Sequence, residues 1–326
     1  MKRLVIAAAL LTGLVFAQPE QQEVIREQFD VDPGGTLEVR SDMGSIEVET
    51  TSDNRVEVTV ERRPRGDSRE DEARMMEDLP VEITRDGNTV RVEVRRRGNW
   101  GRGWGHDRNM RVWIRATVPS KFNVDLNTAG GSISVEDLEG SVEAETAGGS
   151  LSFGDIKGPV NGRTAGGSIT LDGGEGTARL RTAGGSINIG RVKGDVDART
   201  SGGSISIDRA EGTVDAHTSG GSINVDEVMG RIDASTSGGS VTASISAQPS
   251  DDCRLETSGG NVTVYLDPDL KMDLDAQAGG WGRVESDLPV TTRGTIKKSE
   301  LRGEINGGGP LLRLRTSSGR IEIRKR

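Results

Sequence analysis

The residues best suited to bind a ligand lie in one glycine-rich stretch and in one later tripeptide. Residues 98–109 read Gly-Asn-Trp-Gly-Arg-Gly-Trp-Gly-His-Asp-Arg-Asn, and residues 281–283 read Trp-Gly-Arg. Tryptophan offers a flat apolar face and arginine pairs with carboxylates, so together they could stack on sugar rings or hold an acidic glycan. The alternative is that the indoles only plug one end of the fold. The candidate ligand-binding residues are Trp100, Arg102, Trp104, Arg108 and Trp281.

Acidic residues recur further along the chain, at Asp137, Asp155, Asp172, Asp208 and Asp226. Calcium requires several oxygens that converge within about 2.3–2.6 Å in a constant loop geometry. Here the acidic position shifts by one residue between repeats, and the calcium-binding repeat Gly-Gly-x-Gly-x-Asp is absent. We interpret these residues as solvated turn carboxylates, and the sequence predicts neither a metal site nor a cofactor.

Catalytic groups are also sparse. A polysaccharide-acting β-helix enzyme would need convergent carboxylates, or a basic residue beside calcium, on one face. The two histidines are His106 and His217, and earlier repeats carry Arg163, Arg181 and Arg199 at the position of His217. There is no Ser-His-Asp order and no phosphate-binding loop. We therefore predict no catalytic residues, and an enzyme remains the less favoured alternative.

These residues are carried by a chain with a fixed repeat. The sequence Thr-Ala-Gly-Gly-Ser-Ile begins at Thr128, and equivalent threonines follow every 18 residues up to Thr236. Each repeat contains two runs in which apolar and polar residues alternate, as in half-buried strands. Glycines between the runs predict two tight turns, where they would allow a positive φ. The threonines would form a column along the stack.

One repeat cannot bury its Ile and Val residues alone, whereas repeats stacked at roughly 4.8 Å bury a continuous narrow core. The sequence therefore predicts an all-β fold, a single-stranded β-solenoid (β-helix) with 18-residue rungs and irregular capping regions. Antiparallel meanders and propellers rarely keep one residue count through seven units. The outward residues Glu139, Lys157, Glu175 and Lys193 alternate in charge, which favours this register weakly.

The remaining chain is divided around these repeats. Residues 1–17 read as a secretory signal peptide, 18–127 as an N-terminal β-rich region and cap with one short helix, 128–246 as the regular repeats, and 247–326 as irregular C-terminal rungs and cap. We expect the helix at 67–79 and strands at 89–95 and 110–118. We also expect the Ala278 rung to precede the Thr316 rung, and the charged end 324–326 to guard an outer strand edge.

Composition limits the partners and the location. Loss of Lys2 and Arg3 with the signal peptide takes the formal net charge from −9 to −11, so nucleic acid is not expected as a partner. The apolar run at 4–16 is too short to span a bilayer, and we expect no transmembrane helix in the mature chain. The single cysteine, Cys253, excludes an intramolecular disulfide and could be a free, exposed thiol.

Several motifs together resemble a known family. These are the signal peptide, the recurring Thr-Ser/Ala-Gly-Gly-Ser-Ile, the entry Val118-Pro119-Ser120 and the closing Gly308-Gly309-Pro310-Leu311 with Ser318-Gly319-Arg320-Ile321. Over about residues 37–323 the chain resembles the bacterial putative-adhesin family of extracytoplasmic β-solenoids. The resemblance implies a right-handed coil and no catalytic residues.

The sequence thus predicts a non-enzymatic, exported protein of the periplasm, cell surface or extracellular space, acting as a structural or adhesive scaffold. Its expected partners are envelope polysaccharide or surface proteins. The main alternative is a glycan-binding module that uses the Trp/Arg loop at 98–109.

Overall fold

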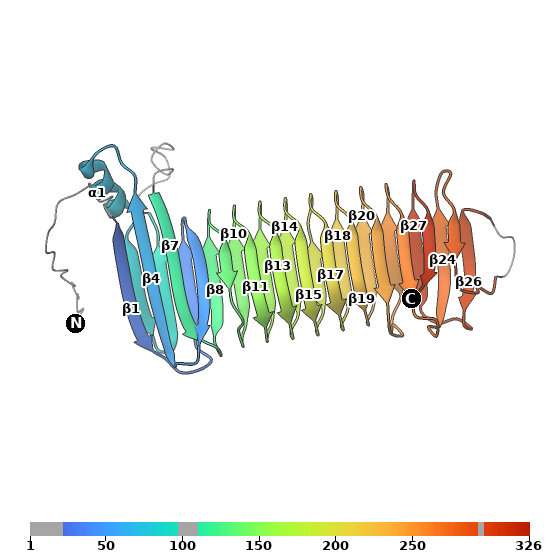
Figure 1. Ribbon diagram of the computed structural model, residues 1–326, viewed down its shortest axis with the longest axis horizontal. Helices are drawn as coiled ribbons and strands as arrows, with labels where there is room; N and C mark the ends of the chain where they lie inside the picture. Colours follow the sequence, from blue (N-terminus) through green and yellow to red (C-terminus); the bar gives the residue numbers. More distant parts are fainter. Residues whose placement is uncertain (1–21, 97–109, 293–296) are drawn as a thin grey trace.

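Two long β-sheets face each other along the whole length of the molecule (Figure 1). The structure is a computed structural model, and it describes residues 22–96, 110–292 and 297–326. Nearly every element in these ranges is a strand, which confirms the predicted all-β solenoid. In the same ranges no helix is both long and apolar enough to cross a membrane.

Each sheet has 14 strands, which follow one another in space from the N-terminal end to the C-terminal end. Sheet A consists of β1 (Glu23–Asp30), β4 (Arg55–Pro64), β7 (Met110–Pro119), β3 (Ser45–Thr51), β9 (Ile133–Val135), β11 (Leu151–Ile156), β13 (Ile169–Gly174), β15 (Ile187–Val192), β17 (Ile205–Ala210), β19 (Ile223–Val228), β21 (Val241–Ile245), β23 (Val262–Leu266), β28 (Ile321–Lys325) and β25 (Val284–Ser286). Sheet B consists of β5 (Val81–Asp86), β6 (Thr89–Val94), β2 (Thr36–Ser41), β8 (Asn123–Thr128), β10 (Val142–Thr146), β12 (Val160–Thr164), β14 (Ala178–Thr182), β16 (Val196–Arg199), β18 (Val214–Thr218), β20 (Ile232–Thr236), β22 (Cys253–Thr257), β27 (Leu311–Thr316), β24 (Met272–Ala278) and β26 (Glu300–Ile305).

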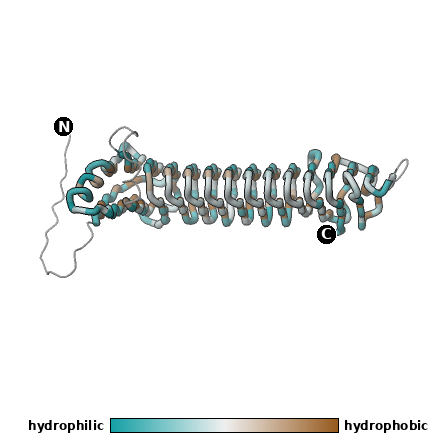
Figure 2. Tube along the Cα trace, turned by 90° about the horizontal axis from the view of Figure 1, so that it is seen from above, coloured by the Kyte–Doolittle hydropathy of each residue, from teal (hydrophilic) through white to brown (hydrophobic). Residues whose placement is uncertain are grey.

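Every 18-residue repeat forms one rung, with one strand in each sheet. Successive strands are parallel and in register, so that Val142 pairs with Val160 and Leu151 with Ile169. The alternation of the sequence places Ile, Val, Leu and Ala between the sheets, where they are buried. Figure 2 shows these rungs as evenly spaced coils of one flattened tube. Most of the stability follows from the shared stripe of apolar side chains and the continuous hydrogen-bonded ladders.

A column of buried threonines connects the rungs, as predicted. The Thr146 hydroxyl donates a hydrogen bond to the Gly131 carbonyl of the preceding rung at 2.7 Å, and Thr164 makes the same bond to Gly149. Thr182, Thr200, Thr218 and Thr236 repeat it at 2.7–2.8 Å. Each hydroxyl thus satisfies a backbone carbonyl that the turn leaves without a strand partner.

Glycine occurs at the repeated Gly-Gly turns for a different reason from the one expected. None of the Gly-Gly pairs of the repeats has a positive φ. Instead, a Cβ added to Gly149 would lie 2.1 Å from the Gly131 carbonyl oxygen, and one added to Gly167 would lie 2.1 Å from that of Gly149. The expectation of a left-handed conformation was therefore wrong at these turns. Glycine is required at the second position of each pair, because there the turns stack without room for a side chain.

At both ends the spatial order of the rungs departs from the order of the sequence. The rung β2–β3 lies between β6–β7 and β8–β9, and the last rung, β27–β28, lies between β22–β23 and β24–β25. The expected order, with the Ala278 rung before the Thr316 rung, was wrong. The charged C-terminal strand β28 pairs with both β23 and β25, so it does not form the outer edge that it was expected to guard.

Antiparallel strands and one helix complete the N-terminal end. The predicted helix forms as α1 (Arg69–Asp78), and the predicted strands form as β6 and β7. Ser68 caps the start of α1 by accepting a hydrogen bond from the Asp71 amide. At the C-terminal end of α1, the guanidinium of Arg62 on β4 donates hydrogen bonds to two carbonyls. These are the Met76 carbonyl, at 2.9 Å, and the Leu79 carbonyl. Arg62 therefore supplies the positive charge that the last turn of the helix itself lacks.

Cys253 lies on the inner side of β22 and is 1% exposed, with no disulfide partner. Burial raises the pKa of its thiol. The cysteine is therefore a free thiol, but not the exposed one that its position in the sequence allowed.

Candidate functional site

Of the predicted ligand-binding residues, the structure describes only Trp281. Trp100, Arg102, Trp104 and Arg108 lie outside the described residues. Trp281 follows β24 at the C-terminal end and is fully exposed, next to Gly280 with a φ of 60°. Trp281 is therefore not part of a surface that includes β7, and its indole does not plug the end of the core.

A different tryptophan, Trp113, lies on the outer face of sheet A. It belongs to β7, the strand that follows the Trp/Arg loop, and its side chain is 36% exposed. The guanidinium carbon of Arg63 lies 5.4 Å from the centroid of its ring, within the range of a cation–π interaction. The sequence analysis missed Trp113. The signal was present, because Val112 and Ile114 flank it and alternation along a strand points the middle residue outward.

The strands beside β7 surround this indole with charged and apolar groups. Glu61 of β4 is paired directly with Trp113, and Val24 of β1 lies beyond Glu61 with 45% of its surface exposed. Arg63 forms an ion pair with Glu61 at 2.5 Å. We call Val24, Glu61, Arg63 and Trp113 the N-terminal aromatic face. An apolar ring bordered by a guanidinium and a carboxylate can stack on a sugar and accept or donate hydrogen bonds around it.

A concave region lies where strands β11, β13, β15, β17 and β19 of sheet A end. It is a groove of about 870 Å³ whose charged lining residues are Asp155, Lys157, Glu175, Arg191, Lys193, Asp208, Arg209, Glu211, Asp226 and Glu227. Lys157 is bonded to Glu139 at 2.8 Å and Lys193 to Glu175 at 2.7 Å. The hydrogen bond from Lys193 lowers the pKa of Glu175. Neighbouring charges therefore neutralise one another along this groove.

The acidic residues of the groove do not form a metal site. Within residues 22–96, 110–292 and 297–326 no three His, Cys, Asp or Glu side chains are grouped so that they could hold a metal ion. Asp137 accepts a hydrogen bond from the Asp155 amide of the next rung at 2.8 Å. This carboxylate therefore connects two successive rungs, in addition to contacting solvent.

A sequence model of one protein family, described as Toastrack DUF4097, matches residues 35–324. The chain belongs to this Toastrack family. The match includes the intercalated rungs at both ends as well as the regular repeats. Among curated proteins, none is similar enough to count as a match.

Several solved structures are similar to this Toastrack chain, all at low sequence identity. One is a putative cell adhesion protein from Clostridium sporogenes ATCC 15579, with 10% identity over 93% of this chain and 100% of that one, and a TM-score of 0.23. Another is a putative adhesin from Bacteroides fragilis NCTC 9343, with 11% identity over 94% and 99% and a TM-score of 0.27. A third is a putative adhesin from Parabacteroides distasonis ATCC 8503, with 12% identity over 92% and 97% and a TM-score of 0.29. At these scores the structures support no argument about the site.

Proposed function

We propose that this Toastrack protein is exported through the signal peptide at residues 1–17 and acts, without catalysis, as a structural and adhesive scaffold of the cell envelope or surface. The observation that carries the proposal is the stack of equivalent rungs. Each rung presents the same outward positions at the strand spacing of roughly 4.8 Å. Contacts that are weak at one rung are repeated along the molecule, and their combined strength exceeds that of any one contact.

Stiffness is the second requirement of a scaffold, and the hydrogen bonds between rungs provide it. The threonine column joins each rung to the one before it. On the outside, the Ser150 amide donates to the Ser132 hydroxyl at 3.2 Å, and the same bond recurs in the following rungs. A rod held at two positions per rung keeps its surface residues at fixed separations, so a long partner can be bound at several places without further ordering.

The experiment measures where the protein is located and how its adhesion depends on the number of rungs. Cells that produce the protein are fractionated and treated with protease from outside, and the purified protein on beads is tested for adhesion to cell envelopes. A variant that lacks residues 200–235 loses two whole rungs while the register of the others is kept. We expect an exported protein whose shortened form folds but adheres more weakly. Retention in the cytoplasm, or adhesion that is independent of rung number, would contradict the proposal.

Exposure of Trp113 favours glycan binding as a second candidate. The N-terminal aromatic face and the loop at 98–109 would then act together, since the loop leads directly into β7. A glycan array is screened with the mature protein and with Trp113→Ala, Trp100→Ala and Trp104→Ala variants. Trp281→Ala serves as the control because it removes an exposed indole at the other end. Selective binding lost in the first three variants only would support this function, and unchanged binding in all four would refute it.

A further inference from the structure

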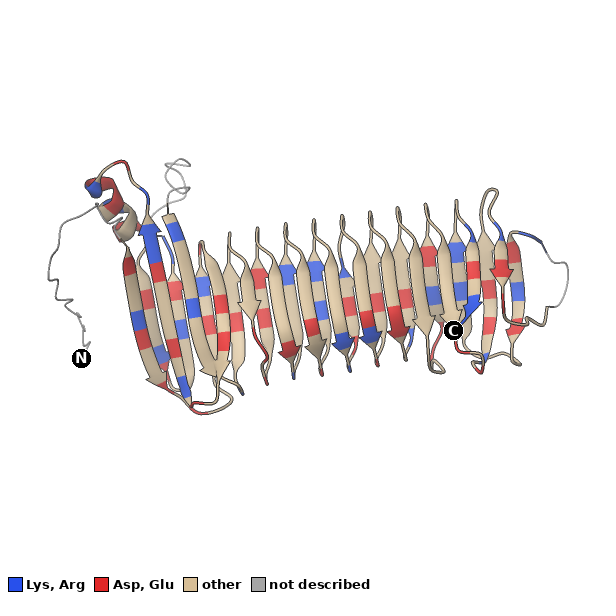
Figure 3. Cartoon of the chain, viewed as in Figure 1, with Lys and Arg blue, Asp and Glu red and all other residues tan. Residues whose placement is uncertain are grey.

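Four arginines gather on the outer face of sheet B, in the middle of the solenoid. Arg163, Arg181 and Arg199 occupy equivalent positions on the adjacent strands β12, β14 and β16, and Arg179 lies two residues before Arg181 on β14. All four are exposed. Figure 3 shows a run of blue bands on neighbouring strands in the middle of the solenoid, with red bands on either side. We call these four residues the arginine patch.

The four guanidinium groups of the patch outnumber the carboxylates around them, which are Asp197 within the patch and Glu143 and Glu145 of β10 on its N-terminal side. Asp197 is bonded to Arg181 at 3.0 Å and to Arg199 at 2.8 Å, so one carboxylate serves two guanidinium groups. The side chains of Arg163 and Arg179 make no hydrogen bond or ion pair with any residue that the structure describes. Partial burial alone would raise the pKa of Asp197, but the bonds from Arg199 and Arg181 outweigh it and keep that pKa below its usual value.

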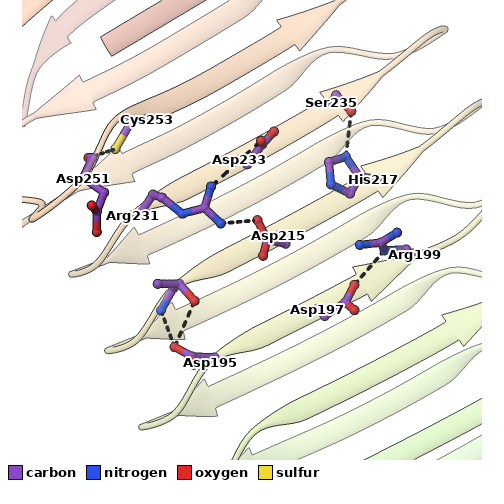
Figure 4. A network of polar contacts seen from close by, with 11 residues as sticks. Asp195, Asp197, Arg199, Asp215, His217, Arg231, Asp233, Ser235, Asp251 and Cys253 are labelled. Carbon is purple, nitrogen blue, oxygen red and sulfur yellow. Dashed lines mark hydrogen bonds and ion pairs between the residues drawn. The ribbon is translucent and has the colours of Figure 1, made fainter. Parts of the chain in front are cut away.

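Acidic groups on the next strands are already engaged. Figure 4 shows Arg231 between Asp215 and Asp233, with Asp215 at 2.7 Å, and His217 bonded to Ser235 at 2.7 Å. These side chains follow Arg199 along the same face of sheet B. The excess positive charge of the patch is therefore not balanced from that side.

The fold does not require arginine at these positions. The equivalent outward position is Glu145 in the rung before Arg163, and His217 and Ser235 in the rungs after Arg199. Like charges opposite one another on adjacent strands destabilise a sheet. A row of arginines at strand spacing therefore costs stability in the isolated protein, and an anion bound across the row would remove that cost.

We propose that the arginine patch binds a carboxylate-bearing polysaccharide whose chain runs along the solenoid axis. The row of Arg163, Arg181 and Arg199 is linear and evenly spaced, which fits a polymer with regularly repeated anionic groups. Guanidinium groups form paired hydrogen bonds with carboxylates. The outward neighbours Asn161, Asp197 and Asp215 are polar, whereas a protein partner would need an apolar centre of contact. Nucleic acid is disfavoured because the chain as a whole is acidic.

The proposal deepens the scaffold function and rests on it, because an exported protein is one that meets acidic polysaccharides. The test uses the purified mature protein on a biosensor with immobilised polygalacturonate, and with fully methyl-esterified polygalacturonate as the uncharged polymer. We expect binding to the charged polymer only, and weaker binding as salt is added. The variant Arg163→Gln/Arg179→Gln should bind at least about tenfold more weakly, since a hydrogen bond to a charged group contributes that much or more.

The matched control is Arg74→Gln/Arg313→Gln, which removes the same charge from helix α1 and from another strand of sheet B. It should bind as the unaltered protein does. Urea unfolding of both variants shows whether the fold is kept, and the patch variant should be no less stable because repulsion is relieved. The proposal would be overturned if both variants lost binding to polygalacturonate equally, or if the protein bound the esterified polymer. It would also be overturned if the protein preferred polyphosphate or single-stranded DNA. Such a result leaves the scaffold function intact, since that function is tested by location and rung number.

Discussion

Replacing Gly149 by alanine tests whether the stacking of turns requires glycine in the repeat. A Cβ at this position would lie 2.1 Å from the Gly131 carbonyl oxygen, whereas real Cβ contacts with such an atom stay beyond 3.0 Å. The two rungs would have to separate by about 1 Å at the turn. The same oxygen accepts the Thr146 hydroxyl at 2.7 Å, so the substitution also disturbs that hydrogen bond.

The expected loss of stability combines these two effects. Forcing an extra methyl group into a packed region costs about 1–3 kcal/mol, and a lost internal hydrogen bond costs about 1 kcal/mol. We therefore expect Gly149→Ala to lower the free energy of unfolding by about 2–4 kcal/mol. The neighbouring Gly148 is the control, because its added Cβ would lie 3.6 Å from the nearest atom, the Gly130 carbonyl oxygen. Gly148→Ala should be neutral or stabilising by up to about 1 kcal/mol, because alanine lowers the conformational entropy of the unfolded chain.

Urea unfolding followed by circular dichroism measures both variants. If the solenoid unfolds in more than one step, amide hydrogen exchange in β10 and β11 reports the local change. Equal stabilities for the two variants would refute the reasoning, and so would a larger loss in Gly148→Ala. Either result would mean that the turns can separate freely, or that the backbone conformation and not the missing Cβ selects glycine.

Four further results are expected. Thr182→Val should cost about 1 kcal/mol in urea unfolding, because it removes the hydroxyl bond to the preceding rung, and Thr182→Ser should restore most of it. Arg62→Met should speed amide exchange in α1, whose last carbonyls it leaves without a donor, and leave the middle rungs unchanged. The Asp197 carboxyl should titrate below its usual range by NMR. Its stabilising contribution is therefore present at neutral pH and is lost as the pH falls through that lowered pKa. Arg199→Gln should move the titration midpoint of Asp197 upward. Cys253 should resist iodoacetamide at neutral pH until the protein unfolds, because burial raises its pKa.

Little of the candidate site could be derived from the sequence. The tryptophans and arginines at 98–109 have side chains suited to binding a glycan. Their spacing in the sequence does not show which other residues lie beside them. Trp281 shares the local sequence Trp-Gly-Arg, and in the structure it follows β24 at the C-terminal end. Trp113 could have been found from alternation alone. Its neighbours could not have been found in this way. Glu61 and Arg63 belong to β4, which pairs with β7, and Val24 belongs to β1, which pairs with β4; all three are distant from Trp113 in the sequence.

The repeat alone is enough to define the rungs. A constant period of 18 residues with two alternating runs fixes which side chains face inward, and it fixes the register because only one register aligns every threonine and every glycine. Other local features of the sequence, outside the repeats, predicted α1, β6 and β7. These features depend on neighbours in the sequence or on identical neighbours one repeat away, so a single sequence contains them.

The order of the rungs at the two ends is instead a property of the tertiary structure. Thr128 bonds to Gly44, 84 residues away, and Thr316 bonds to Gly260, 56 residues away, with the same geometry that elsewhere joins neighbouring repeats. A strand edge accepts any segment with the right alternation, so the sequence does not specify which segment occupies it. The choice depends on the length of the intervening chain and on burial of the whole end. In this protein both choices place a distant rung inside the stack and leave the antiparallel pairs β1–β4, β5–β6 and β24–β26 at its ends.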